Sequence, residues 1–194
     1  MKKLSLIVIV AALSIFMSAA MASANGPNWK GFHGVYAMTA TGSCLNSFTE
    51  FNPGEVAPAD AFSAIIVEEG VWTFAGKGTG TFNGNRFGMT LPPFVGRSAT
   101  PTYIEFDFRY EITRDGEIDI VVDTSTFKAT FLAGPSAGAS FTVDPYTMFG
   151  RLSSDHKTIT LTSGGFEVQT TTLPNGGSLY GICNIGRVLI RVKD

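Results

Sequence analysis

Residues 103–112 read Y-I-E-F-D-F-R-Y-E-I, an unbroken alternation of apolar and charged side chains. The even positions from 104 carry Ile, Phe, Phe, Tyr and Ile, whereas the odd positions from 105 carry Glu, Asp, Arg and Glu. Alternation with period two is typical of a strand that is buried on one face. The turn signal R-D-G follows at 114–116, and E-I-D-I-V-V-D at 117–123 resumes the alternation. The stretch therefore predicts an antiparallel hairpin.

Shorter segments with the same pattern fill the rest of the chain and are separated by turn residues. Turns are expected at 69–70 and 83–85, and the longest loop at 52–60, which contains two prolines. No segment beyond residue 24 shows a convincing helical period, and many short strands of this kind predict a sandwich or a barrel. The further strands are predicted at 34–41, 61–68, 71–82, 126–132, 140–143, 146–152, 158–161, 166–173, 178–182 and 187–192.

The two cysteines, Cys44 and Cys183, lie near opposite ends of the chain. An even number of cysteines in an exported protein predicts a disulfide, with two buried free thiols as the alternative. A disulfide requires Cα atoms within about 7 Å, so the first and last strands must be neighbours. We therefore predict an all-β fold, a single closed antiparallel up-and-down barrel of about eight to ten strands, because closure joins those strands and removes exposed edges.

The N-terminus carries the features of a targeting segment. Two lysines at 2–3 precede the apolar run 4–16, and A-S-A at 22–24 fits the rule for signal-peptide cleavage. We predict a signal peptide at 1–24, with an uncleaved anchor as the alternative, and a barrel domain at 25–194 in the periplasm or outside the cell. Without the two lysines the chain has 12 basic and 16 acidic side chains. That balance argues against nucleic acid as a partner and leaves the signal peptide as the only membrane contact.

G-K-G-T-G-T-F-N-G at 76–84 places three glycines at alternate positions of a predicted strand. The alternation puts Gly76, Gly78 and Gly80 on the same inward face as Trp72 and Phe74. The favoured interpretation is packing, in which the glycines relieve curvature and make room for large side chains from across the barrel. The alternative is a cavity for a small ligand.

The second interpretation defines a candidate ligand-binding site made of aromatic side chains and glycines on the inward faces. The faces that the pattern assigns inward carry hardly any titratable group, and Tyr36, Tyr110 and Tyr180 are their polar members. A small apolar molecule is the partner that such a surface fits. The candidate residues are Tyr36, Trp72, Phe74, Gly76, Gly78, Gly80, Phe82, Phe106, Phe108 and Tyr110.

The chain offers little that resembles catalytic or metal-binding chemistry. His156 lies in S-S-D-H-K at 153–157, but contiguous residues of a tight turn cannot surround a substrate as a hydrolase triad does. No cysteine or histidine lies at metal-ligand spacing from His33 in the sequence, and a disulfide-bonded Cys183 is not a nucleophile. The outward carboxylates at 105–123 indicate a solvated face, with a hard cation as the alternative. We therefore expect no catalytic residue, no metal and no cofactor.

G-F-H-G-V-Y at 31–36, followed by Gly42 and Ser43, resembles the opening of lipocalin- and avidin-type barrels. Those barrels begin with Gly-x-Trp in the first strand, and here Gly34 and Tyr36 occupy the corresponding positions. The chain also looks like small exported bacterial barrels of allene-oxide-cyclase type. The resemblance implies a closed antiparallel barrel with an apolar pocket and suggests Ser43 as a ligand contact.

Three classes of function fit these observations. The favoured one is a non-enzymatic exported barrel that binds a small hydrophobic or aromatic molecule or serves as an envelope interaction module. The second is an outer-membrane barrel, in which the phenylalanines of 103–112 face lipid and the charges face a lumen. The third is a cyclase or isomerase that moulds an apolar substrate inside the barrel.

Overall fold

The computed structural model describes residues 32–52, 56–91, 99–134 and 136–193. The predicted signal peptide at 1–24 lies outside these residues. Within them no helix is long and apolar enough to cross a membrane. The described residues form ten strands: β1 (Gly34–Ser47), β2 (Phe62–Phe74), β3 (Thr79–Thr90), β4 (Ala99–Ile112), β5 (Glu117–Phe131), β6 (Ser140–Val143), β7 (Thr147–Leu152), β8 (Thr158–Ser163), β9 (Glu167–Thr172) and β10 (Ser178–Lys193).

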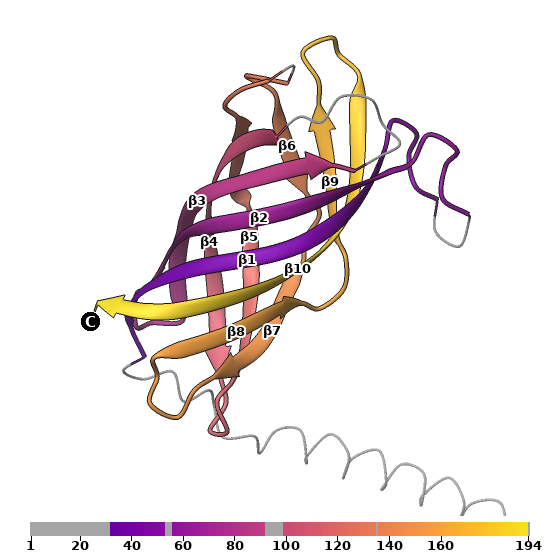
Figure 1. The fold of residues 1–194 in the computed structure, drawn as a ribbon. Helices are drawn as coiled ribbons and strands as arrows, with labels where there is room; N and C mark the ends of the chain where they lie inside the picture. The colour runs from indigo at the N-terminus through magenta and orange to yellow at the C-terminus, as the bar shows by residue number, and fades with distance from the viewer. Residues whose placement is uncertain (1–31, 53–55, 92–98, 135, 194) are drawn as a thin grey trace, which may run out of the picture.

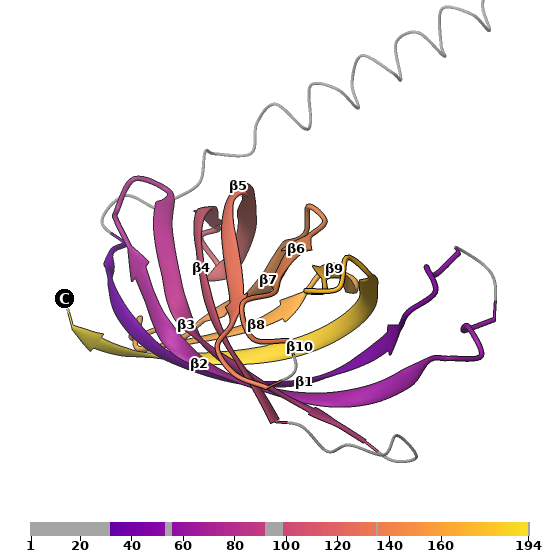
Figure 2. The same cartoon turned by 90° about the horizontal axis from the view of Figure 1, so that it is seen from above.

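The strands pair antiparallel around a common interior and close on themselves (Figures 1 and 2). β1 to β5 follow one another in order, and β10 pairs with β1. Between β5 and β10, the wall is formed by β6 and β9 at one end and by β7 and β8 at the other (Figure 1). Eight described strands therefore surround the interior at each level, which confirms the predicted all-β closed antiparallel barrel.

The wall between β5 and β10 is divided because two strands are interrupted halfway along the barrel. β6 and β7 both lie along β5 and are separated by D-P-Y at 144–146, where proline has no N–H to donate. β8 and β9 both lie along β10 and are separated by G-G-F at 164–166. The segments predicted at 178–182 and 187–192, in contrast, are one continuous strand, β10.

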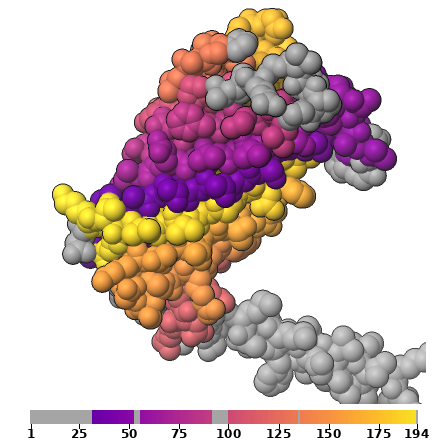
Figure 3. Space-filling model, in the orientation of Figure 1, coloured from indigo at the N-terminus to yellow at the C-terminus, as the bar shows by residue number. Residues whose placement is uncertain are grey.

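The seam between β1 and β10 confirms the predicted disulfide. Cys44 and Cys183 are directly opposite each other in the ladder and are joined by a disulfide, with their Cα atoms 4.1 Å apart. The space-filling view shows the indigo band of β1 lying along the yellow band of β10 (Figure 3). The covalent bond thus reinforces the pairing that closes the barrel.

β4 and β5 form the hairpin that the alternating stretch predicts. Their register shifts between Glu105 and Asp107, where the N–H of Asp107 donates to Thr126 Oγ1 at 2.8 Å. Past this bulge the inward positions of β5 change from even to odd numbers. The strands predicted at 117–123 and 126–132 are therefore one strand with a bulge in the middle.

The strand predicted at 71–82 is wrong, because the chain turns within it. β2 ends at Phe74, and β3 begins at Thr79. Gly76 and Gly78 lie in the turn between them with φ of 80° and 75°. That region of backbone conformation favours glycine, so these two glycines make the hairpin turn.

The turns predicted at 69–70 and 83–85 are also wrong, because both segments lie inside strands. Gly70 of β2 and Gly84 of β3 are paired across the ladder. A Cβ atom at Gly70 would lie 2.6 Å from Cε2 of Phe82, and one at Gly84 would lie 2.7 Å from its Cζ. These glycines therefore make room for the ring of Phe82, and the strands continue past them.

The faces of β4 contradict the arrangement on which the outer-membrane alternative rests. Phe106 and Phe108 are 6% and 1% exposed and belong to the core. Asp107 and Arg109, which alternate with them, lie on the outer face. The apolar face of the stretch thus points into the barrel and the charged face points out of it.

We expect the double substitution C44A/C183A to lower the free energy of unfolding by about 3–5 kcal/mol. The reason is that a disulfide between residues 139 positions apart restricts the unfolded chain over most of its length. Urea denaturation of the variant and of the oxidised wild type measures the difference. Equal midpoints would show that strand pairing alone closes the barrel.

Candidate functional site

One end of the interior is filled by aromatic rings. The rings of Trp72 and Phe108 have centroids 4.7 Å apart, and those of Phe74 and Tyr110 are 5.0 Å apart. The Tyr110 hydroxyl donates to the carbonyl of Phe32 at 2.8 Å, which ties this end to the chain that enters β1. This packed end contains all the aromatic residues of the predicted site, Tyr36, Trp72, Phe74, Phe82, Phe106, Phe108 and Tyr110, each of them buried.

The glycines of the predicted site divide between two places. Gly76 and Gly78 are in the β2–β3 turn, whereas Gly80 lies on the inner face of β3 against the ring of Phe108. A Cβ atom at Gly80 would lie 2.3 Å from Phe108 Cζ. The structure thus brings Gly80 and the seven aromatic residues together. The binding of a ligand by these residues stays a prediction.

Gly80→Ala should destabilise the protein by about 1–3 kcal/mol, because the added methyl overpacks a filled interior. Gly186→Ala is the matched control, since Gly186 also lies in a strand and a Cβ atom there meets nothing within 4 Å. We expect the control to stay within about 0.5 kcal/mol of wild type. Thermal or urea denaturation gives both values. A Gly80→Ala protein as stable as the control would indicate open space beside Phe108.

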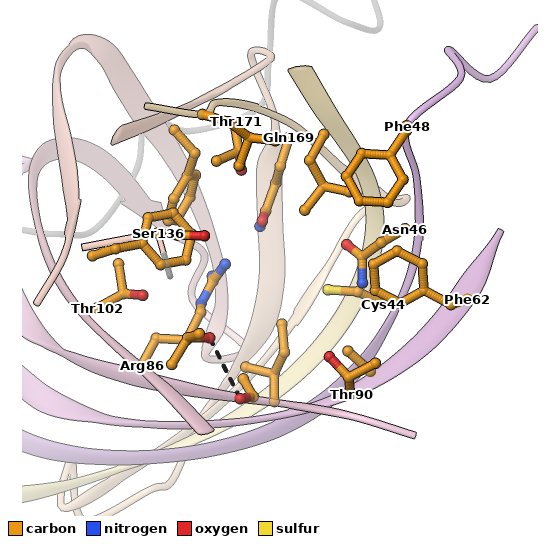
Figure 4. Close-up of a pocket in the computed structure, with 18 of the residues that line it drawn as sticks. Cys44, Asn46, Phe48, Phe62, Arg86, Thr90, Thr102, Ser136, Gln169 and Thr171 are labelled. Carbon is orange, nitrogen blue, oxygen red and sulfur yellow. Dashed lines mark hydrogen bonds between the residues drawn. The ribbon is translucent and has the colours of Figure 1, made fainter. Parts of the chain in front are cut away.

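The other end of the barrel holds a cavity of about 490 Å³ (Figure 4). The inner positions of β2, β3 and β4 at this end are small, for example Ala64, Gly88 and Thr102, so the wall leaves the interior unfilled. The residues that line the cavity are Cys44, Asn46, Phe48, Phe62, Ala64, Ile66, Arg86, Gly88, Thr90, Thr100, Thr102, Phe131, Ser136, Phe141, Gln169, Thr171, Leu173, Pro174, Asn175 and Leu179. Of the residues that the sequence analysis singled out, this cavity contains Cys44 alone.

Aromatic side chains stand on two sides of the cavity. Phe48 and Phe62 contact each other at the end of β1 and the start of β2, with ring centroids 6.1 Å apart. Phe131 and Phe141 face each other from β5 and β6 at 6.0 Å. Phe48 is 53% exposed, so its ring forms part of an accessible rim.

A carboxylate fixes the segment that carries Phe48. Asp60 accepts hydrogen bonds from Ser47 Oγ at 2.8 Å and from the N–H groups of Phe48 and Thr49 at 2.9 and 3.1 Å. The hydrogen bond from Ser47, followed by those from the backbone, lowers the pKa of Asp60 below its usual value despite partial desolvation. Asp60 therefore stays ionised and holds this rim in place.

Between the packed end and the cavity lie four buried charged side chains, Glu68, Arg86, Glu167 and Arg187, which we call the charged belt. Arg86 Nε donates to Glu68 Oε1 at 2.6 Å, and Arg187 Nη2 donates to Glu167 Oε1 at 2.7 Å. Two longer contacts join the pairs: Arg187 Nε lies 3.5 Å from Glu68 Oε2, and Arg86 Nη2 lies 3.7 Å from Glu167 Oε2. The four groups thus form one network with no net charge.

Strand register assembles the belt from distant parts of the sequence. Glu68 is opposite Arg86 in the β2–β3 ladder and opposite Ala40 in the β1–β2 ladder. Ala40 is in turn opposite Arg187 of β10. Glu167 comes from β9, directly after the interruption of that wall strand. Because Ala40 is small, the long side chains on both sides can meet in the interior.

The belt corrects the expectation that the inward faces carry hardly any titratable group. Burial by itself raises the pKa of the Glu68 carboxyl, but the charges of Arg86 and Arg187 outweigh it, so this pKa lies below its usual value. Burial lowers the pKa of Arg187, but Glu167 and Glu68 raise it above the ordinary value. For both groups the attraction between opposite charges outweighs burial and favours the ionised state.

Two polar atoms near the belt lack a hydrogen-bond partner among the described residues. They are Oε2 of Glu167, which has Arg86 as a neighbour at 3.7 Å, and Nε2 of Gln169. Gln169 is 9% exposed and lines the cavity. The guanidinium of Arg86 lies over the ring of Phe141 at 5.3 Å. In Figure 4 the ends of Gln169 and Arg86 both point into the cavity.

The residues considered for catalysis or metal binding lie elsewhere. Ser153 Oγ donates to Asp155 Oδ1 at 2.6 Å. The serine and the aspartate of the β7–β8 turn therefore bond to each other directly and are not linked through His156 as in a hydrolase triad. No group of three His, Cys, Asp or Glu residues within the described part of the chain is placed to hold a metal ion. Ser43, the contact suggested by the resemblance, is exposed on the outer face of β1, and the half-buried Tyr180 has the outward parity of β10.

No family model, no curated protein and no solved structure matches this chain. The finding that stands is therefore a closed antiparallel β-barrel, and the lipocalin- or avidin-type resemblance has no further support.

The buried carboxylate of Glu68 makes stability depend on pH. Because its folded-state pKa is lowered from 4.5, the stabilisation is complete above about pH 4.5 and is lost as the pH falls through the folded-state pKa. Glu68→Gln should cost about 3–5 kcal/mol at pH 7, since it leaves an uncompensated buried arginine.

The cost of Glu68→Gln should shrink towards pH 3, and urea denaturation at several pH values measures it. Glu69→Gln is the matched control, because Glu69 is the next residue of β2 and lies on the exposed face. We expect that control to follow the wild type. A cost of Glu68→Gln that is equal at pH 7 and pH 3 would contradict the assignment of an ionised Glu68.

Proposed function

We propose that this protein binds a small, largely apolar molecule in the cavity at the unfilled end of the barrel. The observation that carries the proposal is the contrast between the two ends of one interior. Protein interiors are normally packed to crystal-like density, and the packed end follows that rule. The other end leaves a cavity of about 490 Å³ unfilled, and this volume lies in the range of small-molecule sites.

The lining supports an apolar ligand with a few polar contacts. Phe48, Phe62, Ile66, Phe131 and Leu179 provide apolar surface on several sides. The lining also contains hydroxyl and amide side chains, for example Asn46, Thr102 and Gln169, as expected for a site in which a few polar groups orient a ligand. The proposed location differs from the aromatic set predicted from sequence, because those rings fill their own end of the barrel.

Export fits the same proposal. The disulfide at the seam is compatible with an oxidising compartment. Together with the signal-peptide pattern at 1–24, it supports a binding protein of the periplasm or the cell exterior.

Filling the cavity should weaken binding. The neutral fluorescent probe N-phenyl-1-naphthylamine reports occupancy of an apolar site, and we expect it to bind the purified protein with an increase in emission. Ala64→Phe places a ring in the cavity, because Ala64 lines it. This variant should weaken probe binding at least about tenfold, which corresponds to about 1.4 kcal/mol.

Ile65→Phe is the matched control, because Ile65 is the adjacent residue on the exposed face of β2. It should bind the probe as the wild type does. Equal binding by wild type and Ala64→Phe would place the probe outside the cavity, and no binding by the wild type would overturn the proposal. Mass spectrometry of a bound molecule before and after incubation distinguishes binding from a cyclase or isomerase reaction.

A further inference from the structure

We propose that the cavity recognises an uncharged molecule through a carbonyl-type hydrogen-bond acceptor, which Gln169 binds at the cavity floor. This inference rests on the proposed function and adds the chemical class of the ligand. Its starting point is Gln169, a residue that lines the cavity and whose buried Nε2 group has no partner among the described residues. Buried donors are nearly always paired, so this amide calls for an acceptor from outside the chain.

The position of Gln169 sets the depth of that acceptor. Glu167, Gln169 and Thr171 share the inner face of β9, and Glu167 belongs to the charged belt. Strand geometry places Gln169 about 7 Å along β9 from Glu167 and Thr171 about 7 Å further on. The amide therefore lies just above the belt, at the inner limit of the cavity, and the apolar walls lie between it and the rim.

The charge of the belt decides between a neutral acceptor and an anion. Both arginines already face two carboxylates, so the four groups sum to zero. A ligand carboxylate at the floor would add an uncompensated charge where Oε2 of Glu167 already lacks a hydrogen bond. Burying such a charge is strongly unfavourable, whereas a ketone, ester or amide oxygen accepts from Gln169 without changing the charge.

Arg86 does not change this conclusion. Its hydrogen bonds within the described residues go to Glu68, and its guanidinium lies over the ring of Phe141. An anion that reached Nη1 of Arg86 would meet a guanidinium whose charge the two belt carboxylates already balance. A neutral acceptor is therefore favoured over an anion, and the donor that we assign to it is the neutral amide of Gln169.

The test compares three molecules of one chain length, decane, 2-decanone and decanoate, as competitors of N-phenyl-1-naphthylamine at pH 8. We expect 2-decanone to be the best competitor for the wild type. Gln169→Leu keeps the approximate size of the side chain but removes the donor, so the ratio of ketone to alkane affinity should fall about fivefold, the value of one ordinary hydrogen bond. Decane affinity should not fall, which also shows that the variant is folded.

Two further variants make the result specific. Gln169→Glu presents a carboxylate in place of the donor and should also lose the preference for 2-decanone. Thr171→Val is the positional control, because Thr171 lies on the same face nearer the rim, and it should retain that preference.

Each outcome decides a different point. If none of the three molecules displaces the probe, both the proposed function and this inference fail. If decane and 2-decanone compete with the same affinity ratio in wild type and Gln169→Leu, the cavity binds apolar molecules but the role of Gln169 is overturned. If decanoate is the best competitor, the site is an anion site and the inference is overturned as well.

Discussion

The antiparallel pairing of β1 with β10 is the constraint on which every other feature depends. It closes eight strands into a ring, and the number of strands in a closed barrel fixes the width of its interior. Cys44 and Cys183 reinforce this pairing covalently. Once the width is fixed, the contents of the interior follow from the side chains that each strand points inward, level by level.

The inward side chains change abruptly along the barrel. On β2 the inner positions run from Ala64 and Ile66 through Glu68 to Trp72 and Phe74. β4 shows the same change, from Thr100 and Thr102 at one end to Phe106 and Phe108 at the other. Because the ring of strands has one width, large residues fill it at one end and small residues leave a cavity at the other. The cavity is therefore a property of the inner faces of several wall strands, β2 to β4 in particular, and not of one loop.

Much of this architecture could be predicted from the sequence, and the reasons differ from residue to residue. The β4–β5 hairpin follows from local alternation, and the pairing of β1 with β10 follows from two cysteines in a chain that carries a signal-peptide pattern. The glycines could not be assigned in this way. Gly76 turns the chain, whereas Gly70 makes room for Phe82, which is the reverse of the strand and the turn that their local sequences predict. Only the ring that arrives from the neighbouring strand distinguishes them.

The candidate site escaped prediction for a related reason. Glu68 and Glu69 are adjacent acids, and the register of β2 decides which of them enters the barrel. The inward position of Arg86 was missed for the same reason, because the turn wrongly predicted at 83–85 ended the strand before this residue. The sequence nevertheless contained a signal. Glu68 is an even-numbered position like Trp72 and Phe74, so a single strand predicted across 69–70 would have placed the side chain of Glu68 on the inner face.

The charged belt also explains why the cavity does not close. An apolar floor over a void relaxes, because neighbouring side chains move partly into the space and recover contacts. Glu68, Arg86, Glu167 and Arg187 cannot move in this way, since a displacement that separates them leaves a buried charge without its partner. Their mutual contacts fix the positions of the four charged groups. A network that contributes little net stability can thus maintain a rigid boundary, and an open cavity with a fixed floor is what a pre-formed ligand site requires.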